Sequence, residues 1–494
     1  MKSAGKGACI LPHGVLFRGN AEATIRRQLV RSGYLKGIIG LPANLFYGTG
    51  IPACIVVLDK ENASARTGVF MIDAAKGFIK DGNKNRLREQ DIHRIVDIFT
   101  KLADSPRYAR MVPVAEIADP KNDYNLNLPR YIDSTEPEDL QDMDGHLRGG
   151  IPERDLDALA AYWNIMPTVR AALFESAGRA GYARLKLPLT AVKPAILGHA
   201  EFSAFQQKAT KVFTGWRKAT TPRLTGFGVD GHPKALIETI AEDLLDTFRQ
   251  APLLDAYDIY QHLMDYWAET MQDDAYLIAA DGWVAVPARI VETDKKGKRK
   301  DKGWACELIP KPLIVARYFA AEQAAIEAAQ AELEAATASL AELEEEHGGE
   351  EGCLGALDKI AKAEVSAQLK AIKADKDAKD EIAVLKRWLE LSENETTLKR
   401  TVREQEAALD TLAYEHYPKL TEAEIQTLVV DDKWMTRLSA AVSGELDRVS
   451  QTLTGRIREL AERYAVPLPQ LTADVAVLAA RVDEHLKKMG AIWN

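Results

Sequence analysis

The chain has 494 residues, of which 46% are hydrophobic and 28% are charged, and its formal net charge is -9 at pH 7. These values are ordinary for a globular protein of roughly three domains, and they exclude a globally basic, histone-like binder of nucleic acid. A local basic surface can still contact DNA. No run of about 18 apolar residues occurs, so we expect no membrane span. The four cysteines lack C-x-x-C spacing, which favours a cytoplasmic chain with reduced thiols and no structural zinc.

The N-terminal segment begins with a short apolar run and one amphipathic helix. Residues 8–11 predict a buried strand, and residues 20–33 predict a helix that Gly33 ends. The helix is expected to bury Ile25, Leu29 and Val30 and to carry Arg26, Arg27 and Arg31 on its opposite face.

Three further apolar runs extend the predicted sheet. Residues 35–41 (LKGIIGL) and 53–58 (ACIVVL) are separated by a loop punctuated with Gly and Pro, which predicts antiparallel neighbours. Residues 68–72 (GVFMI) predict an edge strand. Parallel strands are buried on both faces, so a sheet that starts at residue 7 is expected to start in its middle. We therefore expect the C-terminal half of a Rossmann-like sheet, in which ligands bind at the carboxyl ends of the strands.

The remainder of the chain reads as mostly helical. Residues 119–133 are polar and irregular and mark a boundary, and residues 151–290 alternate apolar and charged positions at helical spacing. Four tryptophans in that region are expected to be core or interface anchors: Trp163, Trp216, Trp267 and Trp283. Residues 254–278 predict an aromatic-rich helix pair, and residues 295–302 (KKGKRKDK) a basic loop.

A long helical hairpin is expected next. Residues 320–346 are rich in Ala, Glu and Leu, lack Lys and Arg, and place Ile326, Leu333 and Leu340 one heptad apart. A Gly-Gly pair at 348–349 ends this run, and a second helical run with many lysines starts near Leu354. The pattern predicts an antiparallel coiled-coil hairpin held by opposite charges.

Four domains follow from these boundaries. They are an α/β part at residues 1–135, a helical domain at 136–314, the coiled-coil hairpin at 315–416 and a C-terminal helical segment at 417–494. In the last of these, residues 431–434 (DDKW) are expected to cap a short apolar run.

No hydrolytic or metal-binding constellation is present in the sequence. His13 follows a proline at a strand end, where a loop-structuring role is favoured over a catalytic one, and His262 is expected to pack inside the aromatic helix. The carboxylates of residues 320–346 predict a solvated helix face. H-E-x-x-H, P-loop and G-x-G-x-x-G motifs are absent.

Two segments are candidates for contact with nucleic acid. The loop at residues 44–50 places Phe46 and Tyr47 before a flexible Gly-Thr-Gly, and Phe46 either stacks on a flat ligand such as an extruded nucleobase or covers the sheet edge. The basic loop offers possible contacts to DNA phosphate or is a solvated lysine-rich loop. Its candidate residues are Lys295, Lys296, Lys298 and Arg299.

These segments resemble the modification (methyltransferase) subunit of type I restriction–modification systems. The matching stretches are GKGACILPHGVLFRGNAEATIRRQLV (5–30), LKGIIGLPANLFYGTGIPACIVVLDK (35–60) and NDYNLNLPRYI (122–132). Residues 257–274 and 420–435 resemble the helical C-terminal part of the longer members. The resemblance implies an S-adenosylmethionine-dependent, adenine-N6-specific DNA methyltransferase that works with DNA, a specificity subunit and a restriction subunit.

The resemblance also implies that motifs essential to catalysis lie outside this sequence. The family carries a Gly-rich loop that holds the cofactor and an Asn-Pro-Pro-aromatic motif that positions the target amino group. Neither occurs here, so no catalytic residue is assigned, and the chain is expected to be inactive without the missing N-terminal half. Phe46 matches the family's base-stacking aromatic.

Two further expectations complete the sequence argument. A sheet that lacks its central strands exposes an apolar edge near residues 8–11, so we expect the chain alone to be poorly soluble or to need an N-terminal partner segment. The alternative to an enzyme fragment is a non-catalytic coiled-coil scaffold or interaction protein that carries a vestigial α/β cap.

Overall fold

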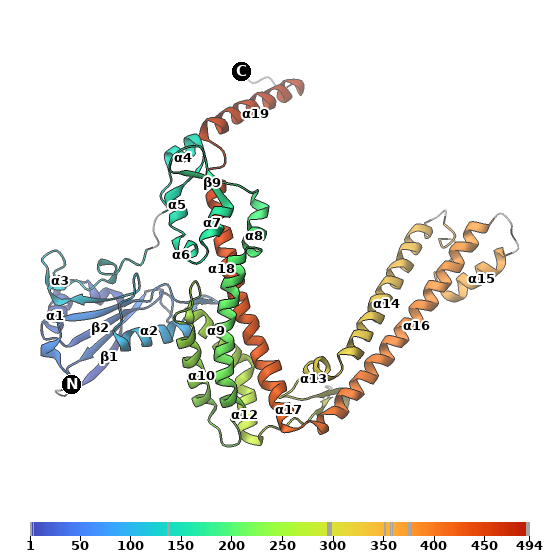
Figure 1. The fold of residues 1–494 in the computed structure, drawn as a ribbon, viewed down its shortest axis with the longest axis horizontal. Helices are drawn as coiled ribbons and strands as arrows, with labels where there is room; N and C mark the ends of the chain where they lie inside the picture. Colours follow the sequence, from blue (N-terminus) through green and yellow to red (C-terminus); the bar gives the residue numbers. More distant parts are fainter. Residues whose placement is uncertain are drawn as a thin grey trace. The chain divides into compact units, whose positions relative to one another are not determined.

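The computed structural model describes residues 2–490 except 3, 136–138, 294–298, 350–351, 356, 358, 374 and 376–377. Two compact units are present, and Figure 1 labels their elements. Unit 1 comprises Met1–Thr220, Lys234–Glu269 and Leu438–Asn494, and unit 2 comprises Thr221–Pro233 and Thr270–Arg437. Both units are discontinuous in sequence, whereas the four predicted domains are consecutive segments. The division into four domains stays a prediction.

A mixed β-sheet forms the start of unit 1. Among the described residues its strands lie in the order β1 (Lys6–Pro12), β3 (Ala53–Asp59), β2 (Leu35–Gly40), β4 (Gly68–Asp73) and β7 (Ala109–Pro113). β3 is antiparallel to both β1 and β2, and β4 is parallel to β2. The predicted antiparallel pairing of residues 35–41 with 53–58 is therefore confirmed, and the carboxyl ends of β1, β2 and β4 meet at one edge.

The strand order corrects two predictions. β4 is an interior strand between β2 and β7, because its side chains alternate between two cores: Val69 and Met71 enter one, and Phe70 and Ile72 the other. β1, predicted to be buried, lies at the edge of the sheet with Ile10 59% exposed. Its outer side has no partner strand among the described residues. The bare apolar edge expected near residues 8–11 is present.

Helices cover both faces of this sheet. One core packs β-strand residues against α1 (Asn20–Arg31), η1 (His13–Leu16), α3 (Val114–Ala118) and η3 (Leu128–Arg130). The other core packs against α2 (Glu89–Lys101) through Ile95 and Ile98. A short turn, η2 (Ala63–Ala65), and a hairpin of β5 (Ile79–Asp81) and β6 (Lys84–Arg86) complete the α/β part.

The predicted faces of α1 are partly wrong. Val30 is buried, but Ile25 is 57% exposed and Arg26 is buried. The Arg26 guanidinium donates to the backbone oxygens of Val15 (2.8 Å) and Tyr124 (3.3 Å), so tertiary hydrogen bonds draw it into the core. Gly33 ends the helix as predicted, since its φ is +69° and a Cβ there would lie 1.9 Å from the Ala63 oxygen.

The rest of unit 1 is helical, with one small sheet that the sequence analysis missed. The sheet has the strand order β8 (Ile151–Pro152), β10 (Tyr182–Leu185) and β9 (Phe174–Ser176). The shorter helices are α4 (Met143–Arg148), α5 (Glu153–Asp157), α6 (Ala160–Trp163), α7 (Pro167–Leu173) and α8 (Leu189–Leu197). The longer ones are α9 (Ala200–Thr225), α10 (Pro233–Phe248), α11 (Ala256–Tyr266), α18 (Thr436–Arg463) and α19 (Leu468–Lys488).

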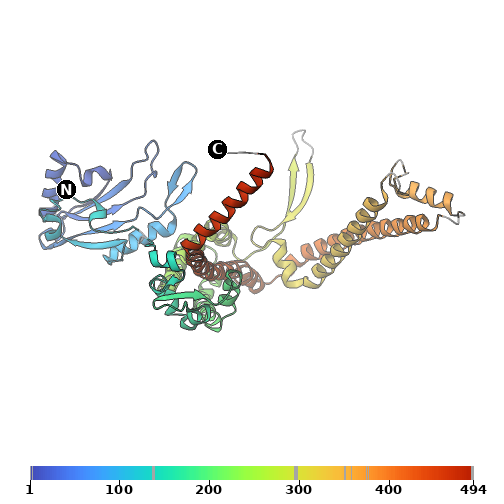
Figure 2. The ribbon, with the colours of Figure 1, turned by 90° about the horizontal axis from the view of Figure 1, so that it is seen from above.

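Unit 2 contains the remaining elements. They are α12 (Gln272–Asp281), β11 (Ala288–Thr293), β12 (Arg299–Ala305), α13 (Lys311–Tyr318), α14 (Ala320–His347), α15 (Lys362–Ile372), α16 (Lys379–His416), η5 (Tyr417–Lys419), α17 (Glu422–Gln426) and the π-helical η6 (Thr427–Met435). Figure 2 shows β11 and β12 as a yellow hairpin. The predicted basic loop is thus partly strand, because residues 299–302 belong to β12 and pair with β11.

Two long helices of unit 2 pack against each other. Side-chain hydrogen bonds join α14 to α16 in antiparallel order: Gln330 with Glu406, Thr337 with Glu395, and Glu344 with Trp388. The lysine-bearing segment expected to start near Leu354 forms the separate helix α15, and Lys362 there pairs with Glu393 of α16. The coiled-coil interpretation stays a prediction.

The helices test three predictions, which concern the tryptophans, residues 254–278 and residues 431–434. The four tryptophans are buried, which confirms them as core residues: Trp163, Trp216, Trp267 and Trp283. The predicted helix pair at 254–278 is one continuous helical run, because a π-helical turn, η4 (Trp267–Met271), joins α11 to α12 without a loop. Residues 431–434 do not cap a helix but lie inside η6, where Trp434 is buried.

No single helix among the described residues is long and apolar enough to cross a membrane. One bent pair, Glu422–Arg463 with Leu468–Lys488, meets the length and composition criteria only when the two helices are taken together.

Candidate functional site

The candidate site lies where β1, β2 and β4 end. β1 leads into His13, β2 leads into the loop of residues 41–52, and β4 ends at Asp73. Backbone hydrogen bonds connect the three exits: His13 N donates to the Pro52 oxygen (3.1 Å), and Ala74 N donates to the Gly40 oxygen (2.9 Å). The sheet therefore brings together residues that are 60 positions apart in sequence, from His13 to Asp73.

His13 is held at this edge in a half-buried position. Burial lowers the pKa of its imidazole below the ordinary value, although Asp73 and the Ala53 backbone oppose that shift. Its Nε2 atom is buried without a hydrogen-bond partner among the described residues. A neutral imidazole packed against Gly40 suits the loop-structuring role, and that role stays a prediction.

The aromatic loop, residues 41–52, is anchored at its base and exposed at its tip. The Asn85 amide Nδ2 donates to the Ala43 oxygen (2.7 Å), and its backbone N donates to the Asn44 oxygen (3.0 Å). At the tip, Phe46 is 40% exposed and Tyr47 is 91% exposed. The Lys84 ammonium lies 3.0 Å from the centre of the Tyr47 ring. Two large aromatic rings are thus offered to solvent from a fixed platform.

A polar cavity of about 290 Å³ opens beside Asp73. Asp73 accepts hydrogen bonds from Ser134 Oγ (2.6 Å) and from Ala75 N (3.2 Å). The lining of the cavity contains equal numbers of acidic and basic residues. The acids are Asp73, Asp91, Asp255 and Asp258, and the bases are Lys76, Arg88, Arg94 and Arg107. This balance gives the cavity no net preference for an anion or a cation.

A charged network fixes α2 to the helices beside it within unit 1. Asp97 accepts hydrogen bonds from Tyr257 Oη (2.7 Å) and Arg249 Nη2 (2.9 Å), and it pairs with Lys101 (2.6 Å). Burial alone would raise the pKa of Asp97, but these three donors hold it at about 2. Gln90 adds hydrogen bonds to Gln261 and Asp258. Hydrogen bonds and ion pairs therefore connect α2 to α11 and to Arg249, the residue that follows α10.

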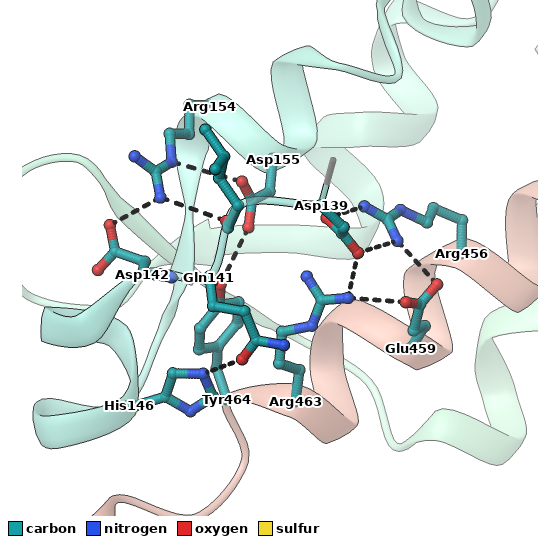
Figure 3. Close-up of polar contacts among 11 residues, drawn as sticks. Asp139, Gln141, Asp142, His146, Arg154, Asp155, Arg456, Glu459, Arg463 and Tyr464 are labelled. Atoms are coloured by element: carbon teal, nitrogen blue, oxygen red, sulfur yellow. Dashed lines mark hydrogen bonds and ion pairs between the residues drawn. The ribbon is translucent and has the colours of Figure 1, made fainter. Parts of the chain in front are cut away.

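Arginines of α18 bind Asp139, which lies in the segment that follows the α/β part (Figure 3). Arg456 donates two hydrogen bonds to the Asp139 carboxylate (2.7 and 2.8 Å), and Arg463 donates a third. These arginines hold the pKa of Asp139 far below its usual value. Glu459 contacts both of them (2.8 and 2.7 Å). The exit of the α/β part is thus bound to a helix more than 300 residues later, which no local pattern in the sequence indicates.

The other predicted site residues lie elsewhere. His262 Nε2 lies 2.9 Å from Glu445 Oε1 of α18, an internal contact rather than a cavity position. Arg299 is exposed on β12 of unit 2, and Lys295, Lys296 and Lys298 lie outside the described residues. All four cysteines are free. No group of His, Cys, Asp or Glu suited to a metal ion occurs in the described part of the chain.

The β5–β6 hairpin is also part of this site, although the sequence pattern did not predict it. Its Asn85 anchors the aromatic loop and its Lys84 contacts Tyr47. One signal was available: residues 76–88 (KGFIKDGNKNRLR) contain five cations and one acid in a chain of net charge -9.

Comparison with known proteins points to one family. The N-6 DNA Methylase family model matches residues 1–140. The type I restriction enzyme MjaVII methylase subunit of Methanocaldococcus jannaschii is 35% identical over 142 residues, 28% of this chain and 24% of that protein. The MpnII methylase subunit of Mycoplasma pneumoniae is 34% identical over 137 residues, 28% of this chain and 25% of that protein. The matches span about a quarter of these relatives.

A solved structure shows a similar local match. The type I restriction–modification methyltransferase subunit from Streptococcus thermophilus is 44% identical over a region that covers 26% of each chain, with a TM-score of 0.24. The region that is similar to known proteins thus contains the sheet edge, the aromatic loop and the β5–β6 hairpin.

Proposed function

We propose that this chain is part of a type I modification subunit, because the N-6 DNA Methylase family model matches its residues 1–140. Its activity is the transfer of a methyl group from S-adenosylmethionine to adenine N6 in DNA. A specificity subunit supplies sequence recognition, and a restriction subunit joins the same cytoplasmic complex. The observation that carries this proposal is the identity of 35% over 142 residues with a type I methylase subunit.

In this proposal a second polypeptide segment adds the remaining strands to the β1 edge of the sheet. Support comes from the free outer side of β1 and from an apolar cavity of about 200 Å³ beside it. Leu11 and Ile25 line that cavity, and both are exposed. A segment that adds a strand to β1 and a helix over this cavity would cover apolar surface that water now contacts.

We further infer that this chain alone does not transfer methyl groups. No Asn-Pro-Pro-aromatic tetrapeptide occurs in the 494 residues, and the notable side chains of the site are His13, Phe46, Tyr47 and Asp73. None of these four side chains carries an amide, and the Asn85 amide is buried and donates to the Ala43 oxygen at the base of the loop. The cofactor and the catalytic motif therefore belong to the added segment, and this chain contributes the aromatic loop.

Complementation tests the proposed function directly. The chain is co-expressed with an N-terminal methyltransferase segment that carries the Gly-rich loop and the Asn-Pro-Pro-aromatic motif, and with a specificity subunit. Transfer of labelled methyl groups to DNA is expected in the complete mixture and not in the chain alone. Activity of the chain alone would contradict the inferred inactivity, and failure of every complete mixture in which the parts co-purify would contradict the proposed function.

Phe46 is proposed to stack on the extruded adenine. Stacking of a base on an aromatic side chain contributes about 1–3 kcal/mol, so Phe46→Ala is expected to lower the rate of the complemented enzyme roughly 10-fold to 100-fold. Phe46→Trp is the matched control and is expected to keep most of the activity. Equal rates for Phe46→Ala and the parent would show that Phe46 only covers the sheet edge.

A scaffold protein is the second candidate. The long pairing of α14 with α16 favours it, because such helices commonly bind partners without catalysis. The two candidates differ in the coding sequence upstream. A stretch that encodes the Gly-rich loop and the Asn-Pro-Pro-aromatic motif favours the enzyme, and its absence together with the lack of a neighbouring specificity-subunit gene favours the scaffold.

A further inference from the structure

The β5–β6 hairpin carries a concentrated positive charge. Residues 76–88 contain Lys76, Lys80, Lys84, Arg86 and Arg88 against the single acid Asp81, although the chain as a whole is acidic. Lys80 is exposed, and the side chain of Arg86 is 62% exposed although it lies 3.3 Å from Asp81. Arg88 is paired with Asp91 and the Lys84 Nζ atom is buried, so Lys80 and Arg86 are the exposed cations of the hairpin. Two exposed cations on one hairpin suit a polyanion better than a small uncharged ligand.

The hairpin is also built into the candidate site. It follows the carboxyl end of β4, and Asn85 of β6 makes two hydrogen bonds to the base of the aromatic loop. The Asn85 side chain holds residue 43 and its backbone amide holds residue 44, so the base of the loop is fixed to β6.

Lys84 provides a second connection between the hairpin and the loop. Its ammonium lies over the Tyr47 ring at 3.0 Å, and no hydrogen-bond partner for it occurs among the described residues. Partial burial lowers its pKa. A buried ammonium held against the exposed Tyr47 ring fixes the position of that ring relative to the hairpin.

We propose that the β5–β6 hairpin binds the phosphate backbone of DNA next to the base that the aromatic loop receives. Lys80 and Arg86 contact phosphates, Lys84 couples the backbone contact to Tyr47, and Asn85 positions the loop. This inference rests on the proposed function, because it assumes a DNA substrate. Contacts of this kind fix orientation rather than sequence, which the specificity subunit reads.

The test measures binding of the full chain to a fluorescein-labelled duplex by anisotropy over a series of salt concentrations. The triple variant Lys80→Gln/Lys84→Gln/Arg86→Gln is expected to bind about 10-fold more weakly at low salt. Its slope of log affinity against log salt is expected to be smaller by about 2, since each lost phosphate contact removes about 0.9. Amide exchange of residues 76–88 in the parent chain is expected to slow when DNA is added.

Two matched variants decide between the hairpin and general charge. Lys370→Gln/Lys373→Gln/Lys386→Gln removes the same charge from exposed positions on and beside α15 and α16, and it is expected to leave affinity within about 2-fold. The second removes the predicted basic contacts Lys295, Lys296, Lys298 and Arg299. The proposal would be overturned if all three variants lost DNA affinity equally, or if only the variant at residues 295, 296, 298 and 299 lost it. Absence of DNA binding by the parent chain would also overturn it. Methyl transfer in the complementation assay decides the proposed function separately.

Discussion

Replacing Lys433 with methionine is expected to lower the free energy of unfolding of unit 2 by about 3–5 kcal/mol. The Lys433 ammonium lies 2.8 Å from the Asp274 carboxylate and 2.8 Å from the Leu308 oxygen. Both charged side chains are buried, with 10% and 4% exposure. Trp434 Nε1 donates a further hydrogen bond to Asp274 at 2.8 Å. Without the ammonium, the buried Asp274 carboxylate keeps the hydrogen bond from Trp434 but has no cation to compensate its charge. Such an uncompensated buried charge lowers the free energy of unfolding strongly.

Chemical denaturation of the parent and the variant measures this difference. Lys399→Met is the matched control, because Lys399 is half exposed and pairs with Glu395 along α16. The control is expected to change the free energy of unfolding by less than about 0.5 kcal/mol. A loss of under 1 kcal/mol in Lys433→Met would mean that water reaches Asp274 and that the pair is not desolvated.

The same substitution is expected to make stability depend on pH. Burial already raises the pKa of Asp274, and Lys433 opposes that shift. A carboxyl with a raised folded pKa stabilises the folded state below that pKa and destabilises it as pH rises through it. Without Lys433 the pKa of Asp274 rises further. The loss of stability in Lys433→Met is therefore expected to be largest near neutral pH and to shrink as the pH falls toward about 4, the pKa of Asp in an unfolded chain.

Local patterns predicted those parts of the fold that short stretches of sequence determine. The pairing of β2 with β3 followed from two apolar runs around a Gly- and Pro-rich loop, and Gly33 marked the end of α1 because no other residue fits its φ of +69° there. The aromatic loop was found for the same reason, since Phe46 and Tyr47 lie in the loop between two predicted strands.

Features that depend on distant partners could not be predicted in this way. β4 is central because it pairs in parallel with β2 and antiparallel with β7, and a crossover of this kind leaves no mark in its own six residues. Arg26 is buried because two distant backbone oxygens accept its hydrogen bonds. Asn85 anchors the aromatic loop from about 40 residues away, so the coupling of hairpin and loop required the structure.

Ile10→Lys is expected to convert a self-associating chain into a monomer. β1 presents an unpaired edge among the described residues, and Ile10 is 59% exposed on it beside the exposed Cys9 and Leu11. An apolar edge strand pairs readily with a second copy, and a lysine on it opposes such pairing by charge repulsion and hydration.

Sedimentation velocity at several protein concentrations follows this change. The parent chain is expected to show concentration-dependent association, and Ile10→Lys a single monomeric species with nearly unchanged stability, because the replaced side chain is exposed. Val229→Lys removes an equally exposed apolar residue far along the sequence and is expected to associate like the parent. A parent chain that is monomeric and melts cooperatively would show that the β1 edge needs no partner. In that case the proposal that a further segment of the methyltransferase completes this sheet would lose its structural support.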